Sequence, residues 1–388
     1  MEKTKSLSPK AKTAFSGIDL PMTLLAAALI AFGCLMIYSA SSVYAEQYHH
    51  DRSYFIVRHV LFALFAVGFT ALVVRFATPG FWQQFGVFLY GASVVMLLLV
   101  LLVLIIGSDL GSGAKRWLDF GFFTVQPSEI AKLGLILILA KYMADHRERI
   151  VGTKKGSFRF GVLYPAMLIG LILILVALEK HISGLMIIGT IGISIMFLGG
   201  TRLRWILLIL GVIVLAGVLL IVLFPYAQAR VDTWLRIEEA DPLGSAWQTL
   251  QGLMAIGSGG LFGRGYGMSR QKFGYVSQPQ NDFIFTIVCE ELGFFGALAV
   301  IFLFALFVWR GFTIARSAPD TASSLIVYGL TFKVALQVIM NIAVVTNSMP
   351  NTGISLPFFS YGGTSLMLQI FEVGIILSIS RFSSNRKV

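Results

Sequence analysis

Long apolar runs alternate along the chain with short segments rich in charged and turn-forming residues. A helix rises 1.5 Å per residue, so about 20 apolar residues cross the ~30 Å hydrocarbon core of a membrane. The pattern predicts an all-α polytopic membrane protein with about ten transmembrane helices, of which the fourth and sixth are short. The predicted spans are 20–43, 55–75, 81–106, 128–143, 160–178, 184–199, 203–224, 283–309, 323–345 and 361–380.

Composition supports the membrane assignment. Hydrophobic residues make up 57% of the 388 positions and charged residues only 13%, whereas soluble domains are about 25% charged. The first span follows a basic stretch without a small-residue cleavage site, and many more spans follow it. We therefore interpret it as a retained helix rather than a signal peptide. Two cysteines, Cys34 and Cys289, suggest neither a disulfide framework nor a zinc site.

The net charge of +11 is distributed between the spans. This pattern is typical of cytoplasmic loops beside anionic lipid, and it does not point to nucleic acid. With an even number of spans the basic clusters share one side, so both termini are predicted to be cytoplasmic. Residues 1–19 and 382–388 are then tails of a single domain, 20–381. The longest extracytoplasmic connection, 225–282, separates the seventh and eighth spans, and we expect the chemistry on that side.

Two outer segments carry unusual charges. Lys115 and Arg116 oppose the positive-inside trend, so they are candidates for holding a phosphate group, or a basic pair that reaches toward lipid headgroups. Gln126 and Ser128 flank the proline that begins the next helix, and we expect them beside the same ligand. Glu129 and Lys132 are further candidates on that helix. They share one face and form either a structural pair or a direct contact to substrate.

The long connection ends in the most informative residues. It contains Gln248 and Gln251, followed by a glycine-rich stretch that lacks the features of a P-loop. Asp282 stands at the mouth of an apolar helix, where it is either a desolvated general base or a helix N-cap. Glu290 and Glu291 follow inside that helix, and their expected partner is a helix lysine such as Lys333.

The segment 350–365 contains two prolines, several glycines and several hydroxyl groups, including Ser360 and Tyr361. Irregular backbone at membrane depth persists only where it contacts protein or a water-filled cavity. We therefore expect these two residues to line a substrate cavity. The residues alone predict an outward-facing polar cavity with basic and acidic groups inside a helical bundle.

Six segments in this order resemble the SEDS family (shape, elongation, division and sporulation), whose members include FtsW, RodA and SpoVE. The resemblance covers nearly the whole chain and rests on the motifs together, since any one of them is weak. These are Tyr-Ser-Ala-Ser at 38–41, Lys-Arg-Trp at 115–117 with Gln-Pro-Ser-Glu at 126–129, Gly-Ser-Gly-Gly-Leu-Phe-Gly at 257–263, Asp-Phe-Ile-Phe at 282–285, Glu-Glu-Leu-Gly at 290–293, and 352–358 with 360–363.

The resemblance implies about ten spans and a peptidoglycan glycosyltransferase activity on lipid II. It implies that Asp282 is the catalytic base, which takes a proton from the acceptor hydroxyl. Lys115, Arg116 or a divalent cation (Mg²⁺ or Mn²⁺) would stabilise the departing pyrophosphate. No organic cofactor is expected. The implied partners are a class b penicillin-binding protein and other membrane proteins of the division machinery.

The chain departs from the family pattern at two places. Gln278 stands where many relatives have glutamate, and 179–184 replaces an acidic turn with a lysine and a histidine. The stretches 38–41 and 269–272 are more similar to the division branch, including its sporulation relative, than to the elongation branch. Two alternatives to the enzyme remain open: a lipid II flippase, which needs a cavity open to both sides, and a scaffold without catalytic activity.

Overall fold

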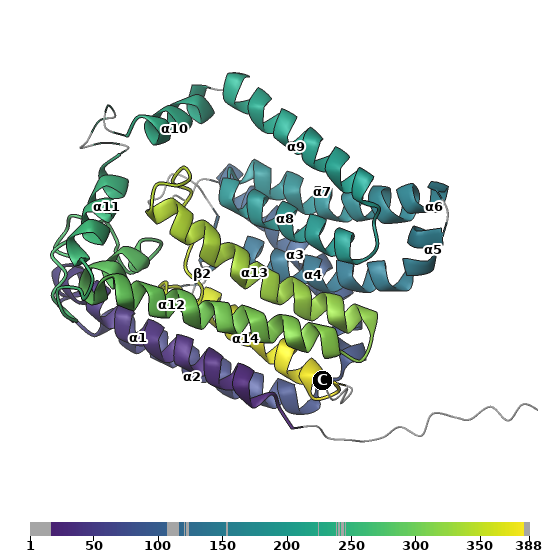
Figure 1. Ribbon diagram of the computed structural model, residues 1–388, viewed down its shortest axis with the longest axis horizontal. Helices are drawn as coiled ribbons and strands as arrows, with labels where there is room; N and C mark the ends of the chain where they lie inside the picture. Colours follow the sequence, from purple (N-terminus) through teal and green to yellow (C-terminus); the bar gives the residue numbers. More distant parts are fainter. Residues whose placement is uncertain are drawn as a thin grey trace, which may run out of the picture.

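The computed structural model describes residues 17–106, 116–119, 121, 124–152, 154–223, 225–237, 239, 241, 244 and 246–383. These residues form an almost entirely helical bundle (Figure 1). The elements are α1 (Leu20–His49), α2 (Tyr54–Phe76), α3 (Pro79–Ile106), β1 (Leu118–Asp119), β2 (Thr124–Val125), α4 (Pro127–Asp145), α5 (Arg147–Gly152), α6 (Lys154–Phe158), the π-helix η1 (Arg159–Leu163), α7 (Tyr164–Leu178), α8 (Ile182–Leu198), α9 (Leu203–Leu223), α10 (Pro225–Leu235), α11 (Trp247–Gly259), α12 (Ile284–Ser317), α13 (Thr321–Val345) and α14 (Gly363–Ser380).

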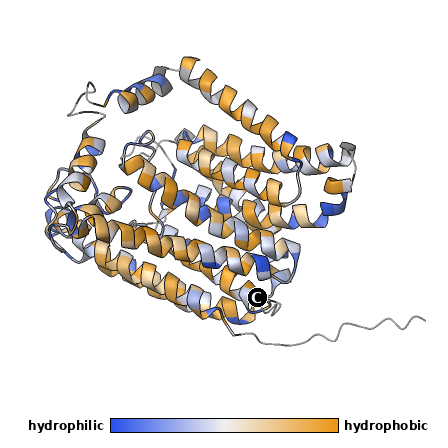
Figure 2. Cartoon of the chain, in the orientation of Figure 1, coloured by the Kyte–Doolittle hydropathy of each residue, from blue (hydrophilic) through white to orange (hydrophobic). Residues whose placement is uncertain are grey.

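Every predicted span overlaps a helix of the structure. By length and apolar composition, seven helices in the described part of the chain qualify as membrane-spanning, and α8 and α9 are shorter apolar helices. The helix α4 carries several charged residues and is mostly buried. Hydrophobic residues dominate the outer helices (Figure 2), which is expected where lipid rather than water surrounds the bundle.

Two local features differ from the sequence prediction. The fold is not purely α-helical, because β1 and β2 form a short antiparallel hairpin in which Leu118 pairs with Val125. The connection 225–282, expected to be a loop, contains the helices α10 and α11. The helices α10 and α11 have 11 and 13 residues, so they lack the long apolar runs by which the membrane-spanning helices are recognised.

The helices of the bundle approach closely where small residues meet. The helix α4 packs against α3, α8 and α13, while α2 packs against α14 and α1 against α12. At Gly134 of α4, an added Cβ would lie 3.0 Å from the backbone nitrogen of Tyr90 in α3. Such contacts let backbones pack directly in the absence of a hydrophobic driving force between helices in lipid.

The helix α12 is broken at Gly293, whose φ of 68° and ψ of −166° are not helical. The stretch after α11 pairs with the broken segment: the amides of Arg264 and Gly265 donate to the carbonyls of Glu290 and Glu291, both at 3.0 Å. An added Cβ on Gly293 would lie 2.2 Å from the Gly263 nitrogen. The break is therefore satisfied by backbone hydrogen bonds and requires glycine.

Candidate active site

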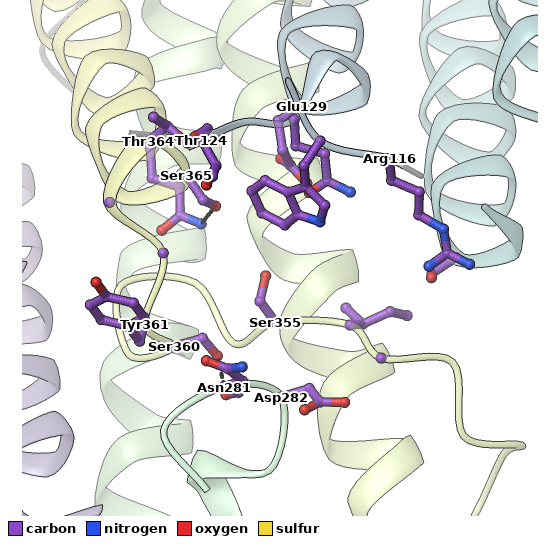
Figure 3. A pocket seen from close by; sticks show the side chains of 18 of the residues that line it. Arg116, Thr124, Glu129, Asn281, Asp282, Ser355, Ser360, Tyr361, Thr364 and Ser365 are labelled. Carbon is purple, nitrogen blue, oxygen red and sulfur yellow. Dashed lines mark hydrogen bonds between the residues drawn. The ribbon is translucent and has the colours of Figure 1, made fainter. Parts of the chain in front are cut away.

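A polar cavity of about 750 Å³ opens at one end of the bundle, between α2, α4, α8, the β hairpin and the two segments that precede α12 and α14 (Figure 3). The structure brings most of the predicted site residues together on its lining. Those that line it are Arg116, Gln126, Glu129, Lys132, Asp282, Ser360 and Tyr361. Residues nearly 250 positions apart in sequence thus share one cavity.

Asp282 is half-buried at the cavity wall, and its side chain points into the cavity (Figure 3). Within the described part of the chain, no other side chain hydrogen bonds to its carboxylate, and its backbone donor is its own amide. An added Cβ on Gly353 would lie 3.6 Å from Asp282 Oδ2, so this glycine leaves the carboxylate open. Burial raises the pKa of Asp282 to about 6, because removing a carboxylate from water disfavours its charged form. The N-cap of α12 is Phe283, so the alternative that Asp282 caps this helix is wrong.

The backbone around Asp282 is fixed by hydrogen bonds from two other elements. Asn341 of α13 donates from Nδ2 to the carbonyl oxygens of both Asp282 and Ile354, each at 2.7 Å. Ser360 Oγ donates to the Asn281 carbonyl at 2.7 Å. These contacts join the segment before α12 to the segment before α14, so the position of the carboxylate is set by the bundle rather than by a free loop.

Positively charged groups lie on other walls of the cavity. Arg116 donates from Nη2 to the Lys180 carbonyl at 2.8 Å. Arg58 of α2 also lines the cavity and stacks over the Tyr54 ring at 4.3 Å. Arg58 was not among the predicted site residues, although it opposes the positive-inside trend in the same way as Arg116. Lys115 lies outside the described residues.

A buried network of four charges extends from the cavity into the bundle. Lys132 lies 2.5 Å from Glu129, Lys333 lies 3.5 Å from Glu129, and Lys333 lies 2.6 Å from Glu372. The predicted Glu129–Lys132 pair is present, and both residues also line the cavity. The network joins α4, α13 and α14, and its two acids and two bases balance one another.

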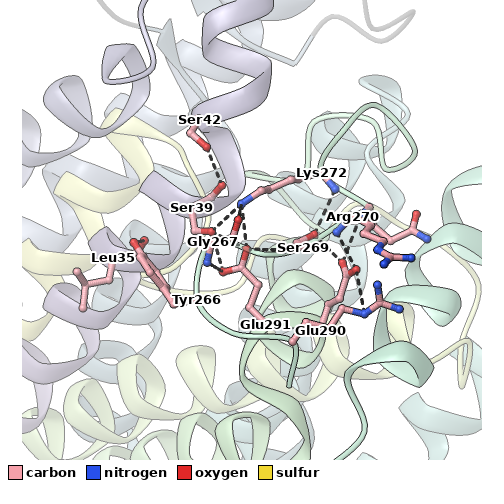
Figure 4. A network of polar contacts seen from close by, with 12 residues as sticks. Leu35, Ser39, Ser42, Tyr266, Gly267, Ser269, Arg270, Lys272, Glu290 and Glu291 are labelled. Carbon is pink, nitrogen blue, oxygen red and sulfur yellow. Dashed lines mark hydrogen bonds and ion pairs between the residues drawn. The ribbon is translucent and has the colours of Figure 1, made fainter. Parts of the chain in front are cut away.

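The prediction that Lys333 pairs with the two glutamates of α12 is wrong. Glu290 and Glu291 instead hold the stretch 264–272 against α1 and α12 (Figure 4). Glu291 accepts hydrogen bonds from Ser39 Oγ at 2.6 Å and lies 3.1 Å from Lys272 Nζ. Glu290 accepts from the Arg270 amide at 2.9 Å. The backbone amides that donate to these carboxylates belong to a turn, which the spacing of residues in the sequence does not reveal.

The turn between α7 and α8 contributes a neutral imidazole to the cavity. His181 lines the cavity, and its Nδ1 lies 3.2 Å from the hydroxyl of Ser128, which is itself buried and does not line it. Burial lowers the pKa of His181 to about 3, and the positive charge of Arg116 lowers it further. Burial raises the pKa of Glu179 to about 8, although the charge of Arg116 acts in the opposite direction. Near neutral pH both side chains are therefore largely uncharged.

Gln248 and Gln251 are not among the residues that line the cavity. Gln248 donates from Nε2 to the Ser277 carbonyl at 3.4 Å, and Gln251 is buried in α11. The described residues contain no group of three His, Cys, Asp or Glu side chains arranged to hold a metal ion. Mg²⁺ commonly uses one or two carboxylates together with substrate phosphates, so a cavity with the open carboxylate of Asp282 fits a cation that arrives with a pyrophosphate.

A family model described as "Cell cycle protein", for FtsW, RodA and SpoVE, matches residues 20–385. The chain belongs to this family. It is 39% identical to the stage V sporulation protein E of Bacillus subtilis, with 94% of this chain and 97% of the relative covered. It is 37% identical to the probable peptidoglycan glycosyltransferase FtsW of Trichlorobacter lovleyi, with 93% of each covered.

Two solved structures share this fold. The rod shape determining protein RodA of Thermus thermophilus matches with a TM-score of 0.69 and 26% identity, over 96% of this chain and 99% of that one. A chain of a peptidoglycan synthase complex, studied for its coordination of polymerization and crosslinking, matches with a TM-score of 0.77 and 27% identity, over 95% and 98%. Membership and fold together identify a multi-pass membrane protein of the FtsW/RodA/SpoVE family.

Proposed function

We propose that this protein is a peptidoglycan glycosyltransferase that polymerises lipid II into glycan strands at the outer face of the bacterial cytoplasmic membrane. Relatives that align over nearly their whole length carry the name of this activity. The observation that carries the proposal is the open carboxylate of Asp282, held by α13 in a cavity whose other walls present Arg58 and Arg116.

In the proposed reaction the acceptor sugar hydroxyl attacks the anomeric carbon of the donor. A new C–O bond forms as the bond from that carbon to the pyrophosphate oxygen breaks, and the configuration inverts. Asp282 takes the hydroxyl proton, and its raised pKa makes it a stronger base than an exposed carboxylate. Arg116 and Arg58 stabilise the charge on the pyrophosphate, since guanidinium groups match phosphate oxygens well. Lys115 is the further proposed contact.

A divalent cation would supply additional charge stabilisation for the leaving pyrophosphate. Asp282 points into the cavity and has no ion-pair partner among the described residues, while Glu129 is already paired with Lys132 and Lys333. Asp282 is therefore the residue that would contact a substrate-bound Mg²⁺ or Mn²⁺. The proton transfer assigned to Asp282 does not depend on that ion.

The proposal places the chain across the membrane with ten spans and both termini in the cytoplasm. The cavity then faces outward, on the side where the positive-inside rule leaves few basic residues. We propose a class b penicillin-binding protein as its partner, since the matching solved chain belongs to a complex for polymerization and crosslinking. Division or sporulation is the proposed setting, because the family model is described as "Cell cycle protein" and one relative is named a sporulation protein.

The test is polymerisation of purified lipid II by the purified protein in liposomes, with and without its transpeptidase. Glycan chains resolved on a gel would support the enzyme. Lipid II that moves between leaflets of the same liposomes without forming chains would favour a flippase. Neither chains nor movement with any partner or cation would favour a scaffold.

A further inference from the structure

A second pocket, of about 450 Å³, lies beside the main cavity. It is bounded by the C-terminal turns of α1 and by the segment that leads to Asp282. Its lining residues are Tyr44, Gln47, Tyr48, Lys272, Gly274, Val276, Ser277 and Gln278. Gln278 lines both the second pocket and the main cavity, so the two spaces adjoin at one side chain.

The length of α1 places this pocket outside the hydrocarbon. Its 30 residues span about 45 Å at 1.5 Å per residue, whereas the apolar core of a membrane is about 30 Å thick. The last turns of α1 contain Glu46, Gln47 and His49, and Glu46 forms an ion pair with Arg52 at 2.5 Å. The helix therefore projects into the aqueous phase on the same side as the cavity with Asp282.

The lining suits a neutral ligand that has both apolar faces and hydroxyl groups. Tyr44 and Tyr48 lie one helical turn apart, and their ring centroids are 4.5 Å from each other. Gln47 and Gln278 add planar amides that both donate and accept hydrogen bonds. Lys272 is the charged residue of the lining, and its Nζ already contacts Glu291 at 3.1 Å and the Gly267 carbonyl at 2.7 Å. A pyrophosphate would find little charge here, whereas a pyranose ring can stack on tyrosine and bond to amides.

The wall of the pocket is built rigidly. Gln278 has a φ of 48°, an unusual value for a residue with a side chain, and its Oε1 accepts a hydrogen bond from Asn281 Nδ2 at 2.6 Å. The preceding stretch is held by the two buried glutamates of α12. Backbone strain of this kind persists where the surrounding structure enforces it, often at ligand sites.

We propose that the second pocket is a saccharide subsite, which binds N-acetylated sugar rings of the glycan strand next to the ring that reacts at Asp282. This inference rests on the proposed function, because the strand is the product of that reaction. A strand that stays bound between additions would remain in register for the next lipid II. The subsite would thus favour long chains rather than the first coupling.

The test compares Tyr48→Ala with Tyr275→Ala. Both side chains are half or more exposed, so neither change should unfold the protein, and Tyr275 lies on the pocket segment without lining the pocket. The probe is a lipid-free tetrasaccharide of alternating N-acetylglucosamine and N-acetylmuramic acid, titrated by calorimetry into each purified variant. It carries no pyrophosphate leaving group, so no turnover takes place. We expect Tyr48→Ala to weaken binding about tenfold, which corresponds to about 1.4 kcal/mol, and Tyr275→Ala to leave it unchanged.

The same two variants, supplied with lipid II, give the second measurement, the length distribution of glycan chains. Tyr48→Ala should shorten the chains and Tyr275→Ala should not. Equal binding and equal chain lengths for the two variants would overturn the subsite while leaving the glycosyltransferase in place. Tetrasaccharide binding that depends on Tyr48, in a protein that makes no chains, would retain the subsite and refute the polymerase. Absence of tetrasaccharide binding to an active enzyme would also overturn the subsite.

Discussion

The buried charge network gives a prediction whose size follows from the contacts. Lys333 is fully buried, and its Nζ lies 2.6 Å from Glu372 and 3.5 Å from Glu129. Lys333→Met removes one of two positive charges and leaves Lys132 alone with two buried carboxylates. Removing one partner of a buried pair costs about 3–5 kcal/mol, because the other charge stays buried and uncompensated.

A compensating substitution separates charge imbalance from loss of packing. In the double variant Lys333→Met/Glu372→Leu the remaining pair, Lys132 and Glu129, is neutral overall and keeps its 2.5 Å contact. Replacing a buried ion pair by apolar residues of similar volume is often neutral or stabilising. The double variant should therefore recover most of the stability that Lys333→Met loses, although it carries one more substitution.

The measurement is the unfolding of purified protein in detergent, by denaturant and by heat, for the wild type, both single variants and the double variant. The four values form a double-mutant cycle, from which the coupling between the two residues is obtained. The reasoning predicts a coupling well above the error and a double variant more stable than Lys333→Met. Additive losses, or a Lys333→Met protein as stable as the wild type, would refute it.

Three further predictions concern the site and its support. Asn341→Leu should lower kcat more than it changes KM, because the Asp282 backbone loses its amide donor; a folded Asn341→Leu protein with the wild-type kcat would contradict it. Gly293→Ala should sharply reduce the yield of folded protein, since its Cβ would collide with the Gly263 backbone. The control Gly257→Ala in α11 has open space around its Cβ and should be tolerated. The two yields are compared by size-exclusion chromatography, and equal yields would contradict the prediction. Polymerisation should rise with pH through about 6 as Asp282 deprotonates, because its pKa is raised to about 6; a rate that falls over that interval would contradict the base.

The sequence predicted the long helices well because a membrane requires a simple apolar pattern over about 20 residues. It predicted less about the connection 225–282, where α10 and α11 form on short stretches with mixed polarity. The break in α12 was also missed. Gly293 could be noticed in the sequence, but its backbone partners lie some 30 residues earlier, at 260–265.

The candidate site was predicted unevenly for a physical reason. Asp282 and Arg116 stood out because a charge at an outer helix end is unusual in any membrane protein. The partners of buried charges depend on which helices are neighbours, so Lys333 was assigned to the wrong glutamates and Glu372 was overlooked. Gln248 was chosen for its place in a polar loop, whereas its amide supports the Ser277 carbonyl.

The central claim is that the Asp282 carboxylate accepts the proton during glycan polymerisation. The most direct measurement is the rate of lipid II polymerisation in liposomes by Asp282→Asn, compared with Asp119→Asn as a matched control. Asp119 also lines the cavity, but it is exposed and its carboxylate accepts from the Gly121 amide at 2.8 Å. The account predicts folded protein that makes no chains for Asp282→Asn and continued polymerisation for Asp119→Asn. Chains from Asp282→Asn at the wild-type rate would contradict it.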